Sequence, residues 1–116
     1  MKLKEYAEQI RIEPRKLTNY ALDPDNPKGK NKALMFQQHL GYNKENYQVL
    51  LEQILSKAPE TEAIPQNQDQ YGTRYQVDIE IQGIEPHQTE IVRTAWLMAP
   101  NTKQARLITA YIKKTP

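Results

Sequence analysis

The spacing of apolar residues changes near residue 71, and this change constrains the fold more than any other feature of the sequence. Before it, apolar residues recur at intervals of three and four, as in an amphipathic helix: Tyr47, Leu50, Leu51, Ile54 and Leu55. After it, they alternate with polar residues, as in a half-buried strand: Tyr75, Val77, Ile79 and Ile81. The sequence therefore predicts helices first and a sheet afterwards.

The N-terminal half is predicted to hold an arm over 1–13, which ends in a short extended piece, and a helical part over 14–58. Pro14 suits the first position of a short helix, because its missing N–H would have no partner there in any case. A longer helix is expected to end at Gly41, since glycine adopts the left-handed conformation without steric cost. The stretch over 59–70 is polar and contains two prolines, so it is predicted to be a linker loop.

The C-terminal part, residues 71–113, is predicted to be an antiparallel sheet. Glu90 to Met98 is apolar on both sides, which is typical of a central strand covered on both faces. Arg106 to Ile112 makes the next strand. The expected fold class is α+β, a single domain over 1–116 in which the N-terminal helices pack on one face of a three- or four-stranded antiparallel meander.

Composition excludes several classes of protein. A chain of 116 residues has the size of one domain, and without cysteine it forms neither a disulfide nor a thiolate metal site. Its formal net charge of +2 is too small by itself to indicate a nucleic-acid-binding protein. No apolar run is long enough for a transmembrane helix or for the apolar region of a signal peptide, so we expect no membrane contact and a cytoplasmic location.

The sequence contains no motif of a known cofactor or catalytic site. P-loop, dinucleotide-binding, zinc-protease and G-x-S-x-G motifs are all missing, so we expect no cofactor and no metal ion. His39 as a cation would complement the dipole at a helix end, and His87 stands in a predicted turn. The alternative for either histidine is a role as ligand or catalytic base.

A cluster of cations before the second predicted helix is a candidate phosphate site: Lys28, Gly29, Lys30 and Lys32. Unpaired backbone N–H groups and the helix dipole favour anions at a helix start. Lysines add the positive charge that binds a nucleic-acid backbone. The alternative is a solvated, charged turn.

A second set of candidates lies on the predicted strands: Tyr71, Thr73, Arg74, Arg93, Thr94, Arg106 and Thr109. In a meander these positions can lie side by side, which would give a face lined by arginine, threonine and tyrosine. Arginine binds phosphate through two hydrogen bonds and stabilises the charge that develops in phosphoryl transfer. The catalytic candidates are Lys32, Arg74, Arg93, Thr94 and Thr109, and Tyr71 is a candidate phosphate ligand.

Arg93 is the most unusual of these residues, because it shares its predicted face with apolar residues such as Ile91. A guanidinium among apolar side chains needs a partner. Asp78 or Glu80 could be that partner, and so could a bound phosphate. The sequence leaves both interpretations open.

Four ordered segments of the sequence resemble an uncharacterised bacterial family. They read KLTNYALDPDNPKGKNKAL, YGTRY, VRTAW and RLITAYI, where the family reads K-L-x-N-Y-x-L-N-P-x-H-P-x-G-x-H-K-A, Y-G-x-R-Y, V-R-S-A-W and R-L-x-x-x-Y-I. The resemblance spans Lys16 to Ile112. Members are common in cyanobacteria, free-standing or at the C-terminal end of toxin-like and phage-head proteins, and their activity is unassigned.

Helices followed by a small antiparallel sheet also resemble the metal-free ribonuclease fold of the barnase, EndoU, colicin E5 and RelE toxins. That resemblance implies an active face made of Lys32, Tyr71, Arg74, Arg93, Thr94 and Thr109. Metal-free RNA cleavage needs a base for the 2′-hydroxyl and cations for the charge on the phosphorane. The two histidines of the family pattern align with Asn26 and Asn31, which cannot transfer protons, so the resemblance implies a weakened or inactive site.

Two functions are consistent with these observations. The first is a small toxin-like ribonuclease, or a degenerate relative of one, that acts on RNA phosphates through its cationic face. The second is a non-catalytic module that docks a partner protein or a larger assembly. Homo-oligomerisation through an exposed edge strand is a third possibility. RNA and a partner protein are therefore the two expected kinds of partner.

Overall fold

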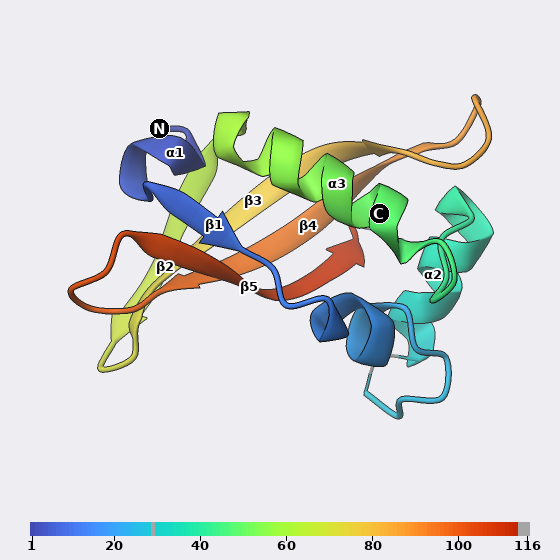
Figure 1. Ribbon diagram of the computed structural model, residues 1–116, viewed down its shortest axis with the longest axis horizontal. Helices are drawn as coiled ribbons and strands as arrows, with labels where there is room; N and C mark the ends of the chain where they lie inside the picture. The colour runs from blue at the N-terminus through green and yellow to red at the C-terminus, as the bar shows by residue number, and fades with distance from the viewer. Residues whose placement is uncertain (29, 114–116) are drawn as a thin grey trace.

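The computed structural model describes residues 1–28 and 30–113, and a five-stranded mixed sheet lies at its centre. The strands lie in the order β1-β5-β4-β3-β2 (Figure 1). Their bounds are Gln9–Arg11 for β1, Ala63–Asp69 for β2, Gly72–Gln82 for β3, Thr89–Met98 for β4 and Gln104–Ile112 for β5. Neighbouring strands are antiparallel, except that β1 runs parallel to β5.

All the helices precede the strands β2 to β5 in the chain. Their bounds are Leu3–Tyr6 for α1, Lys30–Leu40 for α2 and Tyr47–Lys57 for α3, with a π-helical turn η1 at Leu17–Ala21 and a 3₁₀ turn η2 at Ala58–Glu60. Figure 1 shows α3 lying across the sheet and α2 at one end of it. Within residues 1–28 and 30–113, no helix combines the length and the apolar character needed to span a membrane.

The apolar core lies between the helices and one face of the sheet. β3 contributes Val77 and Ile79 to this face and β4 contributes Trp96, all three almost inaccessible to solvent. The helices contribute fully buried residues of their own: Leu3, Phe36, Leu40, Leu50 and Ile54. Burying a side chain of this size stabilises the fold by about 1.5–3 kcal/mol. The alternation of apolar residues along β3 therefore decides which face the helices cover, and the predicted α+β class is confirmed.

The predicted end of the longer helix is also confirmed. Gly41 directly follows α2 and has a φ of 76°, a conformation that glycine adopts without strain. A Cβ at this position would meet the Ile84 side chain at 3.2 Å. Glycine therefore serves both the turn and the close approach of the β3–β4 connection.

The predicted three- or four-stranded antiparallel meander is wrong in its strand number and in one pairing. β1 adds to the edge of β5 and pairs in parallel with it, Gln9 with Gln104 and Arg11 with Arg106. The short extended piece predicted at the end of the N-terminal arm lies where the structure has β1, a strand of three residues. Its partner lies at the other end of the chain, so only the tertiary structure builds the N-terminal arm into the sheet.

The stretch over 59–70, predicted to be a linker loop, contains part of η2 and the whole of β2. β2 pairs with β3, and every residue of β2 except Ala63 is exposed. An edge strand with both faces in solvent shows no apolar alternation, and Pro65 is tolerated there because an edge N–H needs no partner strand. The polar composition of β2 is why the sequence suggested a loop.

β4 is central, as predicted, but only one of its faces is fully covered. Val92 and Trp96 are buried, whereas Ile91 on the other face is 38% exposed. The expectation of cover on both faces is wrong, because α1 and α3 pack on the Trp96 side. The face that carries Ile91 is called the open face below.

Candidate functional site

The sheet divides the predicted catalytic residues between its two faces. Thr94 lies on the covered face with Trp96, while Arg74, Arg93 and Thr109 lie on the open face. The single catalytic face that the sequence suggested is therefore not formed. Each residue has to be considered with the neighbours that its strand gives it.

Thr94 belongs to the core. Its Oγ1 donates a hydrogen bond to the carbonyl oxygen of Val77 at 2.7 Å and accepts one from Nε1 of Trp96 at 2.8 Å. Thr94 has no solvent exposure, so its hydroxyl is used inside the protein and is not offered to a ligand. Thr94 was a candidate for the catalytic face, but alternation along β4 turns it into the core together with Val92 and Trp96.

Arg93 has the carboxylate partner that the sequence left as one of two alternatives. Its Nε and Nη2 donate to the two carboxylate oxygens of Asp78, at 3.0 and 3.2 Å. The pairing of β3 with β4 places these two residues directly opposite each other. The Arg93 guanidinium holds the pKa of Asp78 below its ordinary value, and Lys113 at 3.6 Å contributes to the same effect. This arginine is engaged in a structural ion pair.

Arg74 and Tyr71 lie near the turn between β2 and β3. Nη1 of Arg74 donates to Oδ2 of Asp69 at 2.7 Å. The pKa of Asp69 is lowered first by the backbone N–H of Tyr71 and then by Arg74. Tyr71 is 61% exposed. Figure 1 shows the β2–β3 turn and α2 at opposite ends of the sheet, so the structure does not bring Tyr71 to Lys32.

The predicted phosphate site before α2 is only partly described. Gly29 lies outside the described residues. Lys28 and Lys30 are exposed, and neither forms an ion pair with a described residue. The backbone N–H of Lys28 donates to Oδ1 of Asn26 at 2.9 Å. Lys32 lines two hollows on the surface of the protein.

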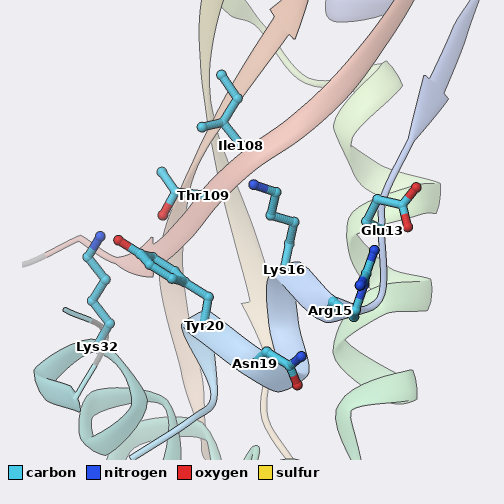
Figure 2. Close-up of a pocket in the computed structure, with 8 residues that line it drawn as sticks. All are labelled: Glu13, Arg15, Lys16, Asn19, Tyr20, Lys32, Ile108 and Thr109. Atoms are coloured by element: carbon cyan, nitrogen blue, oxygen red, sulfur yellow. The ribbon is translucent and has the colours of Figure 1, made fainter. Parts of the chain in front are cut away.

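A cleft of about 670 Å³ lies beside β5 and joins Lys32 to Thr109. Its lining residues are Glu13, Arg15, Lys16, Asn19 and Tyr20 from the N-terminal segment, Lys32 from α2, and Ile108 and Thr109 from β5. Figure 2 shows the side chains of Lys16, Tyr20 and Lys32 directed at the same stretch of β5. We call this cavity the lysine cleft.

The lysine cleft forms because β1 separates from β5 beyond Arg106. β1 pairs with β5 only as far as Arg11, and Pro14 has no N–H with which to continue a ladder. The chain then turns, with hydrogen bonds from the Lys16 N–H to the Glu13 carbonyl at 2.9 Å and from Leu17 to Pro14 at 3.0 Å. The edge of β5 therefore faces η1 and α2 across a cavity and has no strand beside it there.

Lys32 is held in the lysine cleft by aromatic rings. Its ammonium lies 5.5 Å from the ring centroid of Tyr20 and 4.9 Å from that of Tyr111. Such cation–π contacts contribute about 0.5–1 kcal/mol each at an exposed site. Lys32 forms no ion pair with any residue of the described chain. Its charge is therefore positioned by the fold and left without a counter-ion.

The lysine cleft carries an excess of positive charge. Arg15 and Lys16, like Lys32, have no carboxylate partner among the described residues. The carboxylate in the lining is Glu13, and Arg11 donates to it in a close ion pair. An anion entering the cleft meets three free cations and one neutralised carboxylate.

Thr109 gives the lysine cleft a polar group with unused bonding capacity. Its Oγ1 is buried and, in the part of the chain that the structure describes, has no hydrogen-bond partner. A buried hydroxyl left unpaired costs about 1–3 kcal/mol. A water molecule or a ligand that reached this oxygen would recover part of that cost.

Sequence reasoning missed the contribution of η1 and the turn before it. Tyr20 stands out in the sequence as part of the apolar face of a short helix, while Arg15 and Lys16 do not stand out at all. The signal that could have found them is the spacing of four residues between Lys16 and Tyr20, which places both side chains on one side of a helical turn. Their meeting with Lys32 depends on the tertiary structure.

The described residues include no group of three His, Asp or Glu side chains that could hold a metal ion. Neither histidine lines the lysine cleft. Nδ1 of His39 lies 3.8 Å from Glu90 near the end of α2, and His87 is exposed in the β3–β4 connection. The side chains in the cleft that could transfer a proton are Glu13, Tyr20 and the two lysines.

The sequence matches the family described as a domain of unknown function (DUF6883) over residues 2–114. The chain belongs to the DUF6883 family. The predicted relationship to a family without an assigned activity is thereby confirmed. A comparison of the DUF6883 chain with curated proteins gives no match.

The DUF6883 chain is similar in structure to a chain in a contact-dependent growth inhibition toxin–immunity protein complex from Klebsiella pneumoniae 342. The TM-score is 0.67, and the similarity covers 90% of this chain and 93% of the other. The two sequences are 15% identical, so the similarity establishes a shared fold and not a shared activity.

Proposed function

We propose that this protein is a toxin-like, metal-free ribonuclease-fold protein that binds RNA phosphates in the lysine cleft. The observation that carries the proposal is the Lys32 ammonium, which lies between two tyrosine rings and has no counter-ion among the described residues. Lysine binds phosphate as a point charge, and its three N–H donors remain available beside the rings. The phosphate groups of RNA are anions that such a site can bind.

The position of Lys16 supports the same ligand. Lys16 approaches the floor of the cleft from the side opposite α2, so that the cavity has a lysine on each side of Thr109 (Figure 2). Two free ammonium groups on either side of one cavity attract an anion from both directions, and the neighbouring Arg15 adds to the attraction. The charge needed to bind a nucleic-acid backbone is therefore concentrated here although the net charge of the chain is only +2.

A toxin-related role is supported by the fold. The structurally similar chain belongs to a complex of a growth inhibition toxin with its immunity protein. The resemblance to metal-free ribonuclease toxins supports the same role and names RNA as the ligand. The cationic cleft is where such a ligand would bind.

The cleft binds phosphate better than it cleaves RNA. Cleavage needs a base for the 2′-hydroxyl and an acid for the leaving oxygen, and the carboxylate in the lining, Glu13, is already paired with Arg11. The two positions at which the family pattern carries histidine lie beside the cleft. Asn31 lines an adjoining hollow together with Lys32, and Asn26 donates to the carbonyl oxygen of Asn19, a residue of the cleft lining. We therefore infer a catalytically weakened member of its family.

Binding of labelled single-stranded RNA, measured by fluorescence anisotropy at low salt, tests the proposal. We expect the Lys16→Gln/Lys32→Gln variant to bind at least about tenfold more weakly than wild type, since two phosphate contacts are lost. The matched control is Lys2→Gln/Lys4→Gln, which removes two charges near α1, where both lysines face Glu60. Equal weakening by both double variants would contradict a site in the cleft.

Cleavage of the same RNA, followed on a denaturing gel, tests the weakened chemistry. The Asn31→His variant places an imidazole next to Lys32, and we expect it to raise the cleavage rate at least about tenfold, because a positioned acid or base contributes that much or more. The control is Gln37→His, on the same helix but outside the lysine cleft. A wild-type rate that equals or exceeds the rate of the Asn31→His variant would contradict the inference.

One observation favours the alternative of a non-catalytic protein-interaction module. Arg93, which the sequence offered as a phosphate ligand, is bound to Asp78 and serves the sheet. If the wild-type protein binds no RNA in the anisotropy experiment, this alternative replaces the proposal. The predicted oligomer through an edge strand stays a prediction, and β2 is the long edge strand on which it would depend.

A further inference from the structure

A second hollow adjoins the lysine cleft and continues it across the open face of the sheet. Its volume is about 430 Å³, and it shares Glu13, Lys16 and Ile108 with the cleft. Beyond these shared residues it is lined by three arginines: Arg11, Arg74 and Arg106. We call it the arginine hollow. Because Lys16 lines both cavities, the two form one cationic groove along β5.

Strand pairing places the three arginines in one row. Arg11 of β1 is the register partner of Arg106 of β5, Arg106 is the partner of Leu97 of β4, and Leu97 is the partner of Arg74 of β3. The row thus crosses four neighbouring strands of the sheet. Like charges directly opposite each other destabilise a sheet. Glu13 neutralises Arg11 of this facing pair, so the charge that a bound anion would offset is that of Arg106.

The three arginines differ in their ion-pair partners. Arg11 pairs with Glu13 and Arg74 pairs with Asp69, both on the exposed surface. Arg106 is exposed and forms no ion pair with a residue of the described chain. Of the three arginines, Arg106 is therefore the one whose charge is left without a carboxylate partner among the described residues.

We infer that the arginine hollow is a second phosphate subsite and that the ligand is a single strand of RNA that spans both cavities. The inference rests on the proposed function and names the form of its ligand. A flexible single strand can follow a concave cationic groove with successive phosphates, as in proteins that track a single-stranded backbone. Tyr20 and Tyr111 at the Lys32 end offer rings to bases, and Leu97 and Ile108 give the hollow an apolar floor.

Each of the two subsites has its own consequence for affinity. A dinucleotide fills the lysine cleft and gains nothing from Arg106. A longer strand reaches the arginine hollow and gains the contacts there, so affinity rises with length until both cavities are filled. A rigid duplex cannot enter the two cavities with successive phosphates of one strand, so it binds more weakly than a single strand of the same length.

Affinity measured over a series of single-stranded RNAs, from dinucleotide to dodecanucleotide, tests the inference. We expect Arg106→Gln to weaken binding of the dodecanucleotide about threefold to tenfold and to lower the slope of log affinity against log salt by about one. Binding of the dinucleotide stays at the wild-type level. Arg106→Lys keeps the charge and is expected to restore most of the affinity, which shows that the loss in Arg106→Gln does not arise from misfolding.

The control variant is Lys2→Gln, which removes one charge near α1 and leaves Glu60 with Lys4 at 3.0 Å. We expect the length dependence of this variant to equal that of wild type. Equal effects of Arg106→Gln on short and long RNA, or tighter binding of the duplex, would overturn the inference while binding through Lys32 still stood. If no RNA binds to the wild-type protein, both the inference and the proposed function fall.

Discussion

Two groups of cations on the same side of the sheet differ in what holds them. Arg93 is bound by both carboxylate oxygens of Asp78. Lys16 and Lys32 in the lysine cleft form no ion pair with a described residue. Arg93 lies where β3 and β4 are fully paired, whereas the lysines lie where β1 has left β5.

The difference shows how strand pairing selects which cations are free. Within a paired ladder each side chain has a neighbour directly opposite, and Asp78 stands opposite Arg93. Beyond the last pair of β1 with β5, no strand supplies such a neighbour. The residues that approach there come from η1 and α2, and they bring aromatic rings and lysines without a free carboxylate. Anion binding is therefore expected where no carboxylate stands opposite a cation, either because pairing has stopped, as at Lys16 and Lys32, or because the neighbours are Arg11 and Leu97, as at Arg106.

The largest effect is expected from reversing a charge in the lysine cleft. Lys32→Glu replaces a phosphate contact by a repulsion, so RNA affinity should fall about 100-fold, measured by anisotropy at low salt. The free energy of unfolding should fall by about 1–2 kcal/mol, because two cation–π contacts are lost. The matched control is Lys30→Glu on the same helix, which lines neither cavity. An equal fall for both variants would contradict a phosphate site in the lysine cleft, because Lys30 is a cation outside it that forms no ion pair with a described residue.

The next effect in size comes from the covered face. Thr94→Val leaves the Trp96 N–H and the Val77 carbonyl without their buried partner, and we expect the free energy of unfolding to fall by about 2 kcal/mol. The control is Thr109→Val, in which the lost hydroxyl has no partner among the described residues. Its urea denaturation midpoint should equal or exceed that of wild type. A comparable loss in both variants would show that Thr109 is bonded in solution.

A smaller effect is expected from the ion pair on the open face. Arg93→Gln removes two charge-assisted hydrogen bonds to a half-buried carboxylate, and the free energy of unfolding should fall by about 1–2 kcal/mol. Affinity for RNA should change less than about twofold, since Arg93 lines neither cavity. A loss of RNA affinity comparable to that of Lys32→Glu would place Arg93 in the binding site after all.

The smallest effect concerns pH. Arg93 lowers the pKa of Asp78 below its ordinary value of 3.8, so the carboxylate binds fewer protons in the folded state than in the unfolded state. Its contribution to stability is therefore present above pH 3.8 and is lost as the pH falls through the lowered value. Denaturation midpoints measured over the acidic range should decline less steeply for Asp78→Asn than for wild type. Parallel curves would contradict the ion pair.

Local patterns were sufficient to predict most of the elements that contribute to the core. The period of Tyr47 to Leu55 predicted α3, and the alternation from Tyr75 to Ile81 predicted β3, because each element buries one face. β2 was not predicted, because an exposed edge strand has no buried face and therefore no alternation of apolar and polar residues. A short extended piece was predicted at the end of the N-terminal arm, but its parallel pairing with β5 was not, because that pairing depends on residues far along the chain.

The candidate site was predicted less well than the fold. Lys32 and Thr109 were singled out and do meet in one cavity. Arg93 was singled out as well, and its carboxylate neighbour was one of the two partners expected for it. Lys16 and Tyr20 were not singled out as site residues, because a lysine on a short turn and a tyrosine on an apolar face are common features of any small domain.

The sequence alone determined the α+β class and the covered face of the sheet, because helical and strand periods are local and the burial of apolar side chains drives the packing. The tertiary structure decided where positive charge is left free. The parallel pairing of β1 with β5 joins the two ends of the chain, sets Arg11 beside Arg106, and opens the lysine cleft where that pairing stops. No local pattern predicts this contact, because its partners lie almost a hundred positions apart in the sequence and it consists of only three residue pairs.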